Sequence, residues 1–432
     1  GRLQSLHTGI WVLKEETSIW TIRRFSSNMK HIRIIFAVIG LLASVASYAC
    51  TSAIIIGKDG KPMLWKHRDT GTLDNRLEHF KGEKYSFVGL VNSSSEGGEV
   101  WIGSNTAGFS IMNTASYCLK DDNVPAELMD KEGILMYRAL EICASLADFE
   151  HFLDTLSRPM GVEANFGCID SSGGAAYYET SNDRYVKRDV AAMPEKYCVV
   201  TNFSVSGRPE DWKGVERQMT ASDIFRSMED EDGRIDAGPY DLMDMLSRSY
   251  AHKYMGIDLV RDSEAFLSSG TGYFPDQDFI PRRSSSASVA VKGNIMWAAL
   301  GYPSCAVMIP VPVSEEDHVP ACMKRTSESM NCEICDISLN IKYTYVFTPP
   351  GEHVSNMDRY VNLRPVLAGT DGRKSLLECC RDAEEDISER FMRIYSRYGK
   401  GSLEWEDFLK EYDRTASEFI HIVKKKFKTY HK

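Results

Sequence analysis

The sequence predicts an α+β fold in which two sheets are layered between helices, and three observations lead to it. Short runs rich in β-branched and aromatic residues follow one another after residue 50, separated by turn residues such as Asp59-Gly60. Helical patterns come next, and strand-like runs then return further along the chain. This order is typical of a layered α+β sandwich. With 43% hydrophobic residues, the 432-residue chain can build a sizeable core.

The first strand group has the pattern of an antiparallel sheet built from hairpins. Two helices are expected to pack on one face of it. Asp130 is the predicted N-cap of the first helix, which runs to Cys143; Ser145 or Asp148 caps the second, which Pro159 ends. The predicted strands lie at 51–56, 62–66, 85–91, 99–102 and 109–113.

Two further strand groups and a helical tail complete the predicted fold. From Ser375, a predicted N-cap, the pattern is helical and charged to the end of the chain. The expected organisation is a main domain at 50–345, a linker at 346–374 and a C-terminal helical region at 375–432. The later strands are predicted at 165–170, 175–179, 197–201, 287–291, 296–300 and 306–309, with helices at 217–228 and 240–249.

The N-terminal region has the pattern of a signal peptide. A basic stretch at 29–33 precedes an apolar run at 34–43, and Ser47-Tyr48-Ala49 forms a small-x-small cleavage site. A membrane-spanning helix needs about 20 apolar residues, so removal is expected rather than anchoring. We therefore expect residues 1–28 to be a non-native, over-extended stretch and residues 29–49 to be the signal peptide. The protein is predicted to be exported, to the periplasm or as a secreted protein, without stable membrane insertion.

Charge and cysteine content limit the function. The formal net charge is −10, and no Lys/Arg-rich tract adjoins an aromatic cluster, so nucleic acid is not an expected partner. Export would place the eleven cysteines in an oxidising compartment, where those other than Cys50 could pair. Cys332-Glu333-Ile334-Cys335 has the spacing of a zinc or redox pair. However, no second pair stands at zinc-ribbon distance and no strand–helix context suggests thioredoxin, so no metal is expected.

Cleavage after Ala49 would leave Cys50 with a free α-amino group. A thiol needs a base to become the thiolate that attacks a carbonyl, and the α-amine of the same residue, with a pKa of about 8, can serve. Attack on an amide gives a thioester, which water or another acceptor resolves while N–H groups hold the oxyanion. A lipid-anchored cysteine is the other interpretation, but Ser47 and Tyr48 make a poor lipobox.

The segment around this cysteine contains Cys50-Thr51-Ser52, an Asp-Gly turn and Lys66-His67-Arg68-Asp69. It resembles the start of the N-terminal cysteine hydrolases of the choloylglycine hydrolase, penicillin V acylase and acyl-CoA:6-aminopenicillanic acid acyltransferase group. The resemblance implies that Asp69 holds the amine and thiol of Cys50. The family has Arg where this chain has Lys66, a substitution that removes the planar fork of the guanidinium.

Further similar segments extend to about Pro312. Ile111-Met112-Asn113 resembles the strand that leads to an oxyanion Asn, and Thr201-Asn202-Phe203 resembles the segment with a second polarising Asn. Glu216-Arg217 stands where the family has the start of an Arg-bearing helix. The resemblance thus implies catalytic roles for Cys50, Asp69, Asn113, Asn202, Lys66 and Arg217.

The resemblance also implies a four-layer αββα sandwich, an Ntn hydrolase-like fold, with a C-terminal helical extension and with no metal or organic cofactor. The implied activity is cleavage of a linear carbon–nitrogen amide bond in a small molecule; acyl transfer and assembly into a homo-oligomer stay open. Two alternatives also stay open: a cysteine dipeptidase of the same superfamily and a lipid-anchored surface binding protein. The substrate pocket is expected from the loops at 68–76, 116–124 and 203–212.

Overall fold

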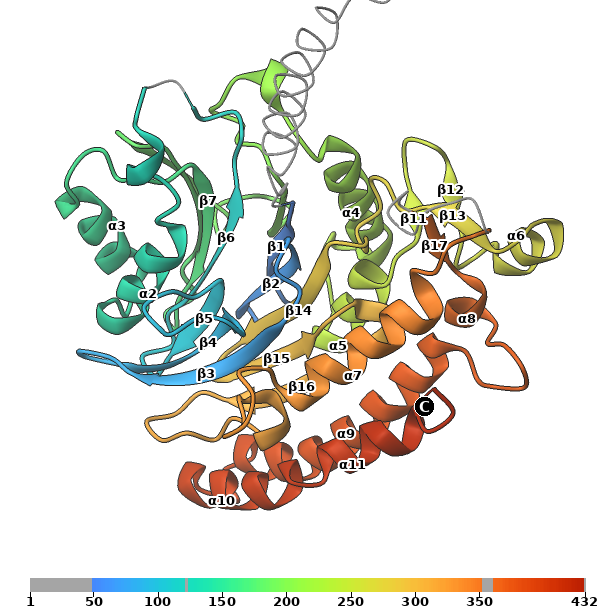
Figure 1. The fold of residues 1–432 in the computed structure, drawn as a ribbon. Helices are drawn as coiled ribbons and strands as arrows, with labels where there is room; N and C mark the ends of the chain where they lie inside the picture. Colours follow the sequence, from blue (N-terminus) through green and yellow to red (C-terminus); the bar gives the residue numbers. More distant parts are fainter. Residues whose placement is uncertain (1–48, 121–122, 352–359, 431–432) are drawn as a thin grey trace, which may run out of the picture. The chain divides into compact units, whose positions relative to one another are not determined.

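Two antiparallel sheets lie face to face at the centre of the fold (Figure 1). The computed structural model describes residues 49–120, 123–351 and 360–430, which all fall in the unit Tyr48–Lys432. The predicted non-native stretch at 1–28, and the predicted signal peptide apart from Ala49, lie outside the described residues. Within the described ranges, no helix has both the length and the hydropathy that crossing a membrane requires.

The first sheet has six strands in the order β10-β1-β2-β14-β15-β16. Its central strands are buried on both faces: Ile54 of β1 belongs to the core between the sheets, whereas Ile55 packs with the helices on the opposite face. The predicted strand at 51–56 therefore carries apolar side chains on both faces of the sheet. The bounds are β1 (Thr51–Ile56), β2 (Pro62–Asp69), β10 (Tyr197–Val200), β14 (Ser285–Lys292), β15 (Ile295–Leu300) and β16 (Ile309–Pro312).

The second sheet has seven strands, in the order in which they follow along the chain. Every strand pairs with its sequence neighbour, so the sheet is an antiparallel meander, in which α2 and α3 lie between β6 and β7 along the chain. Its two edge strands, β3 and β9, are absent from the sequence prediction. The bounds are β3 (Asn75–Lys81), β4 (Ser86–Asn92), β5 (Ile102–Asn105), β6 (Ser110–Ala115), β7 (Ala164–Ile169), β8 (Ala175–Thr180) and β9 (Tyr185–Asp189).

Helices α2 (Glu132–Ile142) and α3 (Leu146–Thr155) cover the outer face of the seven-stranded sheet, where they form an apolar core with its strands. Ser145 is the N-cap of α3, and Asp148 completes a capping box three residues later. The prediction that Asp130 caps the preceding helix is wrong. Asp130 adopts φ +61°, which does not suit the extended N-cap geometry, and Lys131 takes that position without a side-chain hydrogen bond.

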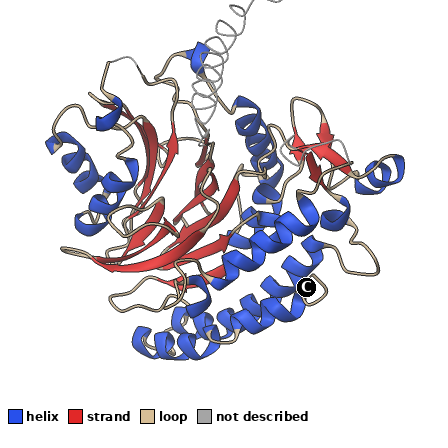
Figure 2. Ribbon diagram, viewed as in Figure 1, coloured by secondary structure: helices blue, strands red, loops and turns tan. Residues whose placement is uncertain are grey.

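The outer face of the six-stranded sheet is covered by a larger helical layer (Figure 2). Helices α4 and α5 pack against β1 and β2, and α9 packs against β15, where Trp297 meets Phe391 in an edge-to-face contact with ring centroids 6.3 Å apart. Ser375 caps α9 as predicted, in a capping box with Glu378. The bounds are α4 (Val215–Met228), α5 (Pro239–Leu242), α7 (Glu333–Ile341), α9 (Leu376–Gly399), α10 (Trp405–Ala416) and α11 (Phe419–Lys426).

These layers confirm the predicted four-layer αββα sandwich with C-terminal helices. Short elements complete it, including a π-helical turn at Lys342–Val346 that continues α7. The other short elements are β11 (Ala251–His252), β12 (Ile257–Asp258), α6 (Ser263–Ser269), β13 (Tyr273–Pro275), β17 (Tyr360–Asn362) and α8 (Arg364–Leu367).

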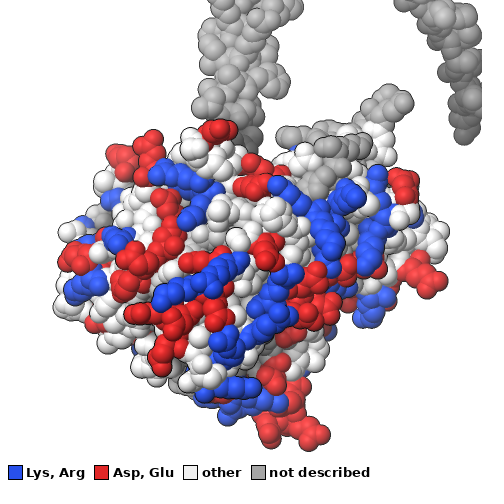
Figure 3. All heavy atoms as spheres, turned by 90° about the horizontal axis from the view of Figure 1, so that it is seen from below, with Lys and Arg blue, Asp and Glu red and all other residues white. Residues whose placement is uncertain are grey.

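On the face drawn in Figure 3, basic and acidic side chains are interspersed, in keeping with surface ion pairs such as Lys426–Asp386.

Candidate active site

Cys50 lies immediately before β1, between β10 and β2 in the six-stranded sheet. Its side chain is buried, with 6% of the residue exposed, and its Sγ lies 4.0 Å from the backbone carbonyl oxygen of Asp69 at the end of β2. The antiparallel pairing of β1 with β2 brings these two strand ends together. The predicted nucleophile and its predicted carboxylate partner are therefore neighbours.

The carboxylate of Asp69 is fully buried in a network of polar side chains. Ser285 donates its hydroxyl to Asp69 Oδ1 at 2.6 Å, His67 Nε2 lies 3.4 Å from the same oxygen, and Arg282 contacts Oδ2. Burial by itself would raise the pKa of the Asp69 carboxyl, but Arg282 and His67 outweigh it and hold this pKa well below its usual value. Asp69 is therefore an anion at neutral pH.

Arg282 is a site residue that the sequence analysis missed. Besides Asp69, its Nη2 donates to the carbonyl oxygen of Ala49 at 2.9 Å. That carbonyl belongs to the peptide bond that joins Ala49 to Cys50, which is the bond predicted to be cut. The only local signal is the pair Arg282-Arg283 just before strand β14.

Lys66 and Asn113 connect the two sheets beside the thiol. Lys66 Nζ donates to Asn113 Oδ1 on β6 at 2.8 Å and to the Trp101 carbonyl oxygen at 2.6 Å. Burial lowers the pKa of Lys66 to about 8, although a negative charge on Cys50 would act in the opposite direction. Lys66 therefore contacts Asn113, the predicted oxyanion residue, directly.

Arg217 and Asn202 approach Cys50 from the helical side. Arg217, on the first turns of α4, donates through Nη1 to the Cys50 carbonyl oxygen at 2.6 Å and through Nη2 to Asn202 Oδ1 at 2.7 Å. Burial lowers the pKa of Arg217 to about 9, and the positive charge of Arg282 adds to this. Gly214 precedes α4 with φ +78°, and a Cβ there would collide with the Arg217 guanidinium.

The six predicted residues therefore lie in one region of the described chain. Asp69 and Arg217 touch Cys50 directly, Asn202 is held by Arg217, and Lys66 holds Asn113 within electrostatic reach of the thiol. No group of three or more His, Cys, Asp or Glu side chains within the described ranges is arranged to hold a metal ion.

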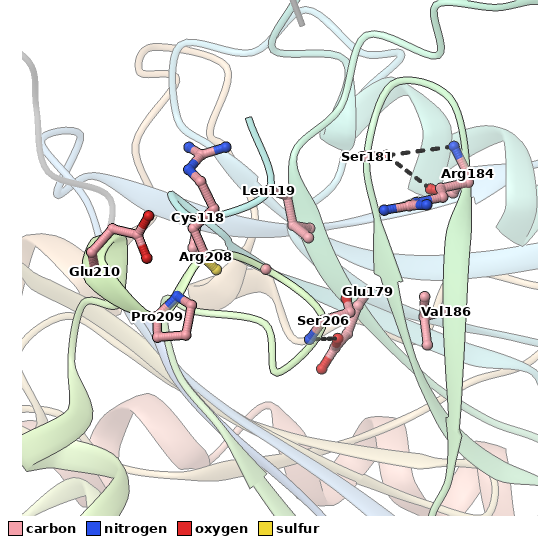
Figure 4. A pocket seen from close by; sticks show the side chains of 11 residues that line it. Cys118, Leu119, Glu179, Ser181, Arg184, Val186, Ser206, Arg208, Pro209 and Glu210 are labelled. Carbon is pink, nitrogen blue, oxygen red and sulfur yellow. Dashed lines mark hydrogen bonds between the residues drawn. The ribbon is translucent and has the colours of Figure 1, made fainter. Parts of the chain in front are cut away.

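A cavity of about 440 Å³ opens next to the segments that follow Asn113 and Asn202 (Figure 4). Asn202 Nδ2 donates to the Ala115 carbonyl oxygen at 3.0 Å, which joins the two segments. Two of the three predicted pocket loops line the cavity, while the loop at 68–76 contributes none of its lining. The lining residues are Cys118, Leu119, Glu179, Ser181, Arg184, Val186, Ser206, Gly207, Arg208, Pro209 and Glu210.

Fold and site together define a layered αββα protein with a cysteine at the head of a central strand, beside a buried carboxylate. No protein-family model matches the chain, and no curated protein matches it in sequence. Among solved structures, it is similar to a Caenorhabditis elegans N-acylethanolamine-hydrolyzing acid amidase ortholog, at 14% identity and a TM-score of 0.36. That alignment covers 56% of this chain and 92% of the amidase.

Two bacterial structures give similar values. Penicillin V acylase from Agrobacterium tumefaciens aligns at 14% identity with a TM-score of 0.36, covering 61% of this chain and 86% of the acylase. A variant of the conjugated bile acid hydrolase from Clostridium perfringens aligns at 10% identity with a TM-score of 0.37, covering 62% and 94%. The fold assignment itself rests on the sheet order and the layers described above.

Proposed function

We propose that this chain is an exported N-terminal-nucleophile cysteine amide hydrolase, which becomes active when the bond between Ala49 and Cys50 is cut. The observation that carries the proposal is the set of groups that converge on Cys50. Asp69 and Arg282 lie beside the peptide bond whose nitrogen would become the α-amine, and Arg217 holds the carbonyl of the same residue. These contacts would fix the thiol and the amine of one residue in a single orientation.

In the proposed reaction, the free α-amine of Cys50 takes the thiol proton, and the thiolate attacks the amide carbonyl of the substrate. The carbon–nitrogen bond then breaks, the leaving amine takes the proton, and an acyl thioester remains on Sγ. Water, activated by the same α-amine, hydrolyses the thioester and restores the thiol. The carboxylate of Asp69 would stabilise the ammonium form of the amine during both steps.

Asn113 and Asn202 are the proposed oxyanion donors. A cation holds the amide oxygen of each: Lys66 holds Asn113 Oδ1, and Arg217 holds Asn202 Oδ1. Because an amide oxygen facing a cation leaves the NH₂ group on the other side, these contacts fix which end of each amide faces the substrate. Asn202 Nδ2 already donates one hydrogen to the Ala115 carbonyl oxygen, so its second hydrogen would serve the oxyanion together with the NH₂ group of Asn113.

The proposed substrate is a small molecule with a linear amide bond. The 440 Å³ cavity is within the size range of sites for small organic ligands, and it is lined in part by the loops that follow both proposed oxyanion donors. Transfer of the acyl group to an amine in place of water would use the same thioester.

Replacement of the nucleophile tests the proposal. The processed protein, with Cys50 at its terminus, should hydrolyse amides, and the Cys50→Ala variant should show no turnover. Cys143→Ala is the matched control, because Cys143 is a buried cysteine of the α2 helix end and should leave turnover intact. A form that retains Ala49 should be as inactive as Cys50→Ala. An active Cys50→Ala protein would disprove the mechanism.

A substrate panel would separate this function from that of a cysteine dipeptidase. The panel compares dipeptides with N-acyl amides, bile-salt conjugates and penicillin V, all presented to the processed protein. Hydrolysis of N-acyl amides without cleavage of dipeptides supports the proposal, and the reverse result favours a dipeptidase. The intact mass of the exported protein adds a second test, since a diacylglyceryl group on Cys50 would rule out the free amine.

A further inference from the structure

The C-x-x-C pair that the sequence analysis singled out lies at the start of α7. Cys332 is the N-cap of this nine-residue helix and Cys335 is its third residue, one turn further on. Cα atoms three residues apart on a helix are about 5 Å from each other. Disulfide-bonded cysteines have Cα atoms about 4.4–6.8 Å apart. The two cysteines can therefore be joined with only a small adjustment of the first turn.

Both thiols contact the same short segment, residues 73–75, which leads from the end of β2 into the first residue of β3. Cys332 Sγ donates to the Asn75 carbonyl oxygen at 3.1 Å, and the Asn75 N–H donates to Cys335 Sγ at 3.5 Å. Cys335 Sγ also donates to the Leu73 carbonyl oxygen at 3.7 Å. A disulfide has no S–H group, so its formation would remove both S–H donors from this segment.

The segment leads directly to the candidate active site. Asn75 Oδ1 accepts from Arg68, and Asn75 Nδ2 donates to the Ser286 carbonyl oxygen at 3.2 Å. The Arg68 guanidinium lies 5.1 Å from the centre of the Trp101 ring, and the Trp101 carbonyl is an acceptor of Lys66. The chain of contacts from the two thiols to Lys66 therefore passes through only Asn75, Arg68 and Trp101.

The pair also has a route to solvent. Both cysteines are buried in the folded protein, at 0% and 1% exposure. The six residues at 325–330, shortly before Cys332, are all exposed and form neither helix nor strand. Opening of such a segment costs less than global unfolding, and it would uncover Cys332 before Cys335.

We propose that Cys332 and Cys335 are a thiol–disulfide exchange site whose oxidation loosens the Asn75 segment and lowers the activity of the adjacent site. The oxidant is a small disulfide such as oxidised glutathione. Burial raises the pKa of the Cys332 thiol in the folded protein, so its thiolate forms once the 325–330 segment has opened. This thiolate attacks the small disulfide, expels one glutathione thiolate and leaves a mixed disulfide. The Cys335 thiolate then attacks Cys332 Sγ and expels the second glutathione. Two protein thiols become one disulfide, one glutathione disulfide becomes two thiols, and the two protons pass to the expelled thiolates.

The site is tested first by thiol mapping of the full chain, which is equilibrated in glutathione buffers of increasing oxidation and then alkylated in denaturant, so that burial does not shield a free thiol. The expected result is loss of two hydrogens in the peptide that holds Cys332 and Cys335, with both residues protected from alkylation until a reductant is added. The Cys335→Ser variant should stop at the mixed disulfide and retain one glutathione on Cys332. Both cysteines staying alkylatable under strongly oxidising conditions, or a disulfide with another partner, would overturn the proposal.

The link to Asn75 is tested by amide hydrogen exchange. Oxidation should speed exchange in the peptide that contains residues 73–76, and the double variant Cys332→Ser/Cys335→Ser should show no dependence on the oxidant. Cys143→Ser, which keeps the pair, should respond as the unmodified chain does. A disulfide at the predicted position with unchanged exchange at 73–76 would refute the coupling.

The effect on activity rests on the proposed amide hydrolysis. Oxidation should lower kcat/KM by roughly two- to tenfold, the factor that corresponds to the net free energy of one hydrogen bond, and a dithiol should restore it. Equal kcat/KM in both redox states would contradict the proposal. If no amide is cleaved in either state, the proposed function fails, while thiol mapping and hydrogen exchange still decide on the disulfide and its contact with Asn75.

Discussion

Arg282 joins the buried carboxylate of Asp69 to the carbonyl of Ala49, and thus links the end of β2 with the peptide bond before Cys50. The two side chains come from positions 213 residues apart, and Asp69 has no exposed surface. A carboxylate kept ionised at this point can hold an ammonium group once the peptide bond has been cut.

Loss of the Asp69 charge should therefore disable the processed protein. We expect Asp69→Asn to lower kcat by about 10²–10⁴-fold, the range over which an acid–base partner contributes to catalysis. Asp59→Asn, at the hairpin between β1 and β2, removes a carboxylate of the same strand pair far from the thiol and should change kcat little. Steady-state kinetics on a cleaved amide measures both, and near-normal kcat for Asp69→Asn would exclude the role of this carboxylate.

Removal of Arg282 should destabilise the fold in a way that depends on pH. The Arg282→Met variant leaves Asp69 as a buried anion without its strongest partner, a change that costs about 3–5 kcal/mol in comparable pairs. Arg282 is the largest cause of the low pKa of Asp69, with His67 next, so the contribution of the Asp69–Arg282 pair to stability is complete at neutral pH. In the variant, Asp69 can be protonated as the pH falls, so the difference in unfolding free energy should narrow toward acid pH. Denaturant unfolding at several pH values measures it. A constant difference would contradict the assignment; exposed Arg325→Met is the control.

Lys66 should make the free energy of unfolding depend on pH in the alkaline range. Its pKa is about 8 in the folded protein and about 10.4 in the unfolded chain, so between these values the unfolded state binds more protons. Stability of the unmodified protein should therefore rise with pH through this window relative to Lys66→Met, which has no such proton. Urea unfolding at pH 7.5 and at pH 10 would show the change, whereas exposed Lys61→Met should show none.

Glu132, at the first position of α2, should make stability fall as pH rises, the opposite of the effect of Lys66. Burial raises its pKa to about 7, against about 4.3 in an unfolded chain, so the folded state binds more protons between these values and loses stability as pH rises through them. Glu132→Gln keeps an oxygen for the Glu163 N–H and carries no charge. It should be more stable than the unmodified protein by about 1–3 kcal/mol at pH 8, with the gain gone below pH 4. The exposed Glu127→Gln serves as control.

A buried ion pair fixes the C-terminal helices to the sandwich. Glu384 on α9 accepts from Arg248 at 2.7 and 2.8 Å and from the Met308 N–H at 2.8 Å. Glu384→Ala should lower the free energy of unfolding by about 3–5 kcal/mol, because it leaves a buried Arg248 guanidinium whose nearest remaining carboxylate is Asp244, at 3.4 Å. Arg381 is on the same helix as Glu384 and forms an exposed ion pair with Asp244. Arg381→Ala should lower the free energy of unfolding by less than about 1 kcal/mol. Similar losses for both variants would contradict this assignment.

Much of the fold is predictable because its signals are local. The strand at 51–56, the capping box of α3 and the N-cap at Ser375 each occupy a few consecutive residues. The missed strands β3 and β9 form the two edges of the seven-stranded sheet. Edge strands tolerate charged residues, as in the sequence Tyr-Val-Lys-Arg-Asp of β9, so they lack the apolar pattern on which the prediction depends.

The boundaries of other elements depended on tertiary contacts. The strand expected at 99–102 begins only at Ile102, and the Trp101 carbonyl before it is an acceptor of Lys66. The helix expected at 240–249 is α-helical only to Leu242 and continues as a π-helical turn. Neither difference has a signal in the local sequence.

Some residues of the candidate site also have a local sequence signal, and one does not. Cys50 could be found from the cleavage pattern before it, and Asp69, Asn113, Asn202, Lys66 and Arg217 from short segments that resemble a family. Arg282 could not, because nothing in Pro281-Arg282-Arg283 distinguishes a buried ion-pair partner from two solvated charges. Its role depends on a carboxylate more than two hundred residues away.

The contact between Trp297 and Phe391 has a consequence for the evolution and engineering of the chain. The outer face of β15 is apolar because α9 covers it, and the same core includes Phe408 and Tyr412 of α10. A shortened chain that ends before α9 would present this face to water, and would need polar replacements at Trp297 and its neighbours to stay folded and dispersed. Relatives without the helical extension should therefore carry a different, more hydrophilic β15, so that the length of a homologue can be inferred from a single strand.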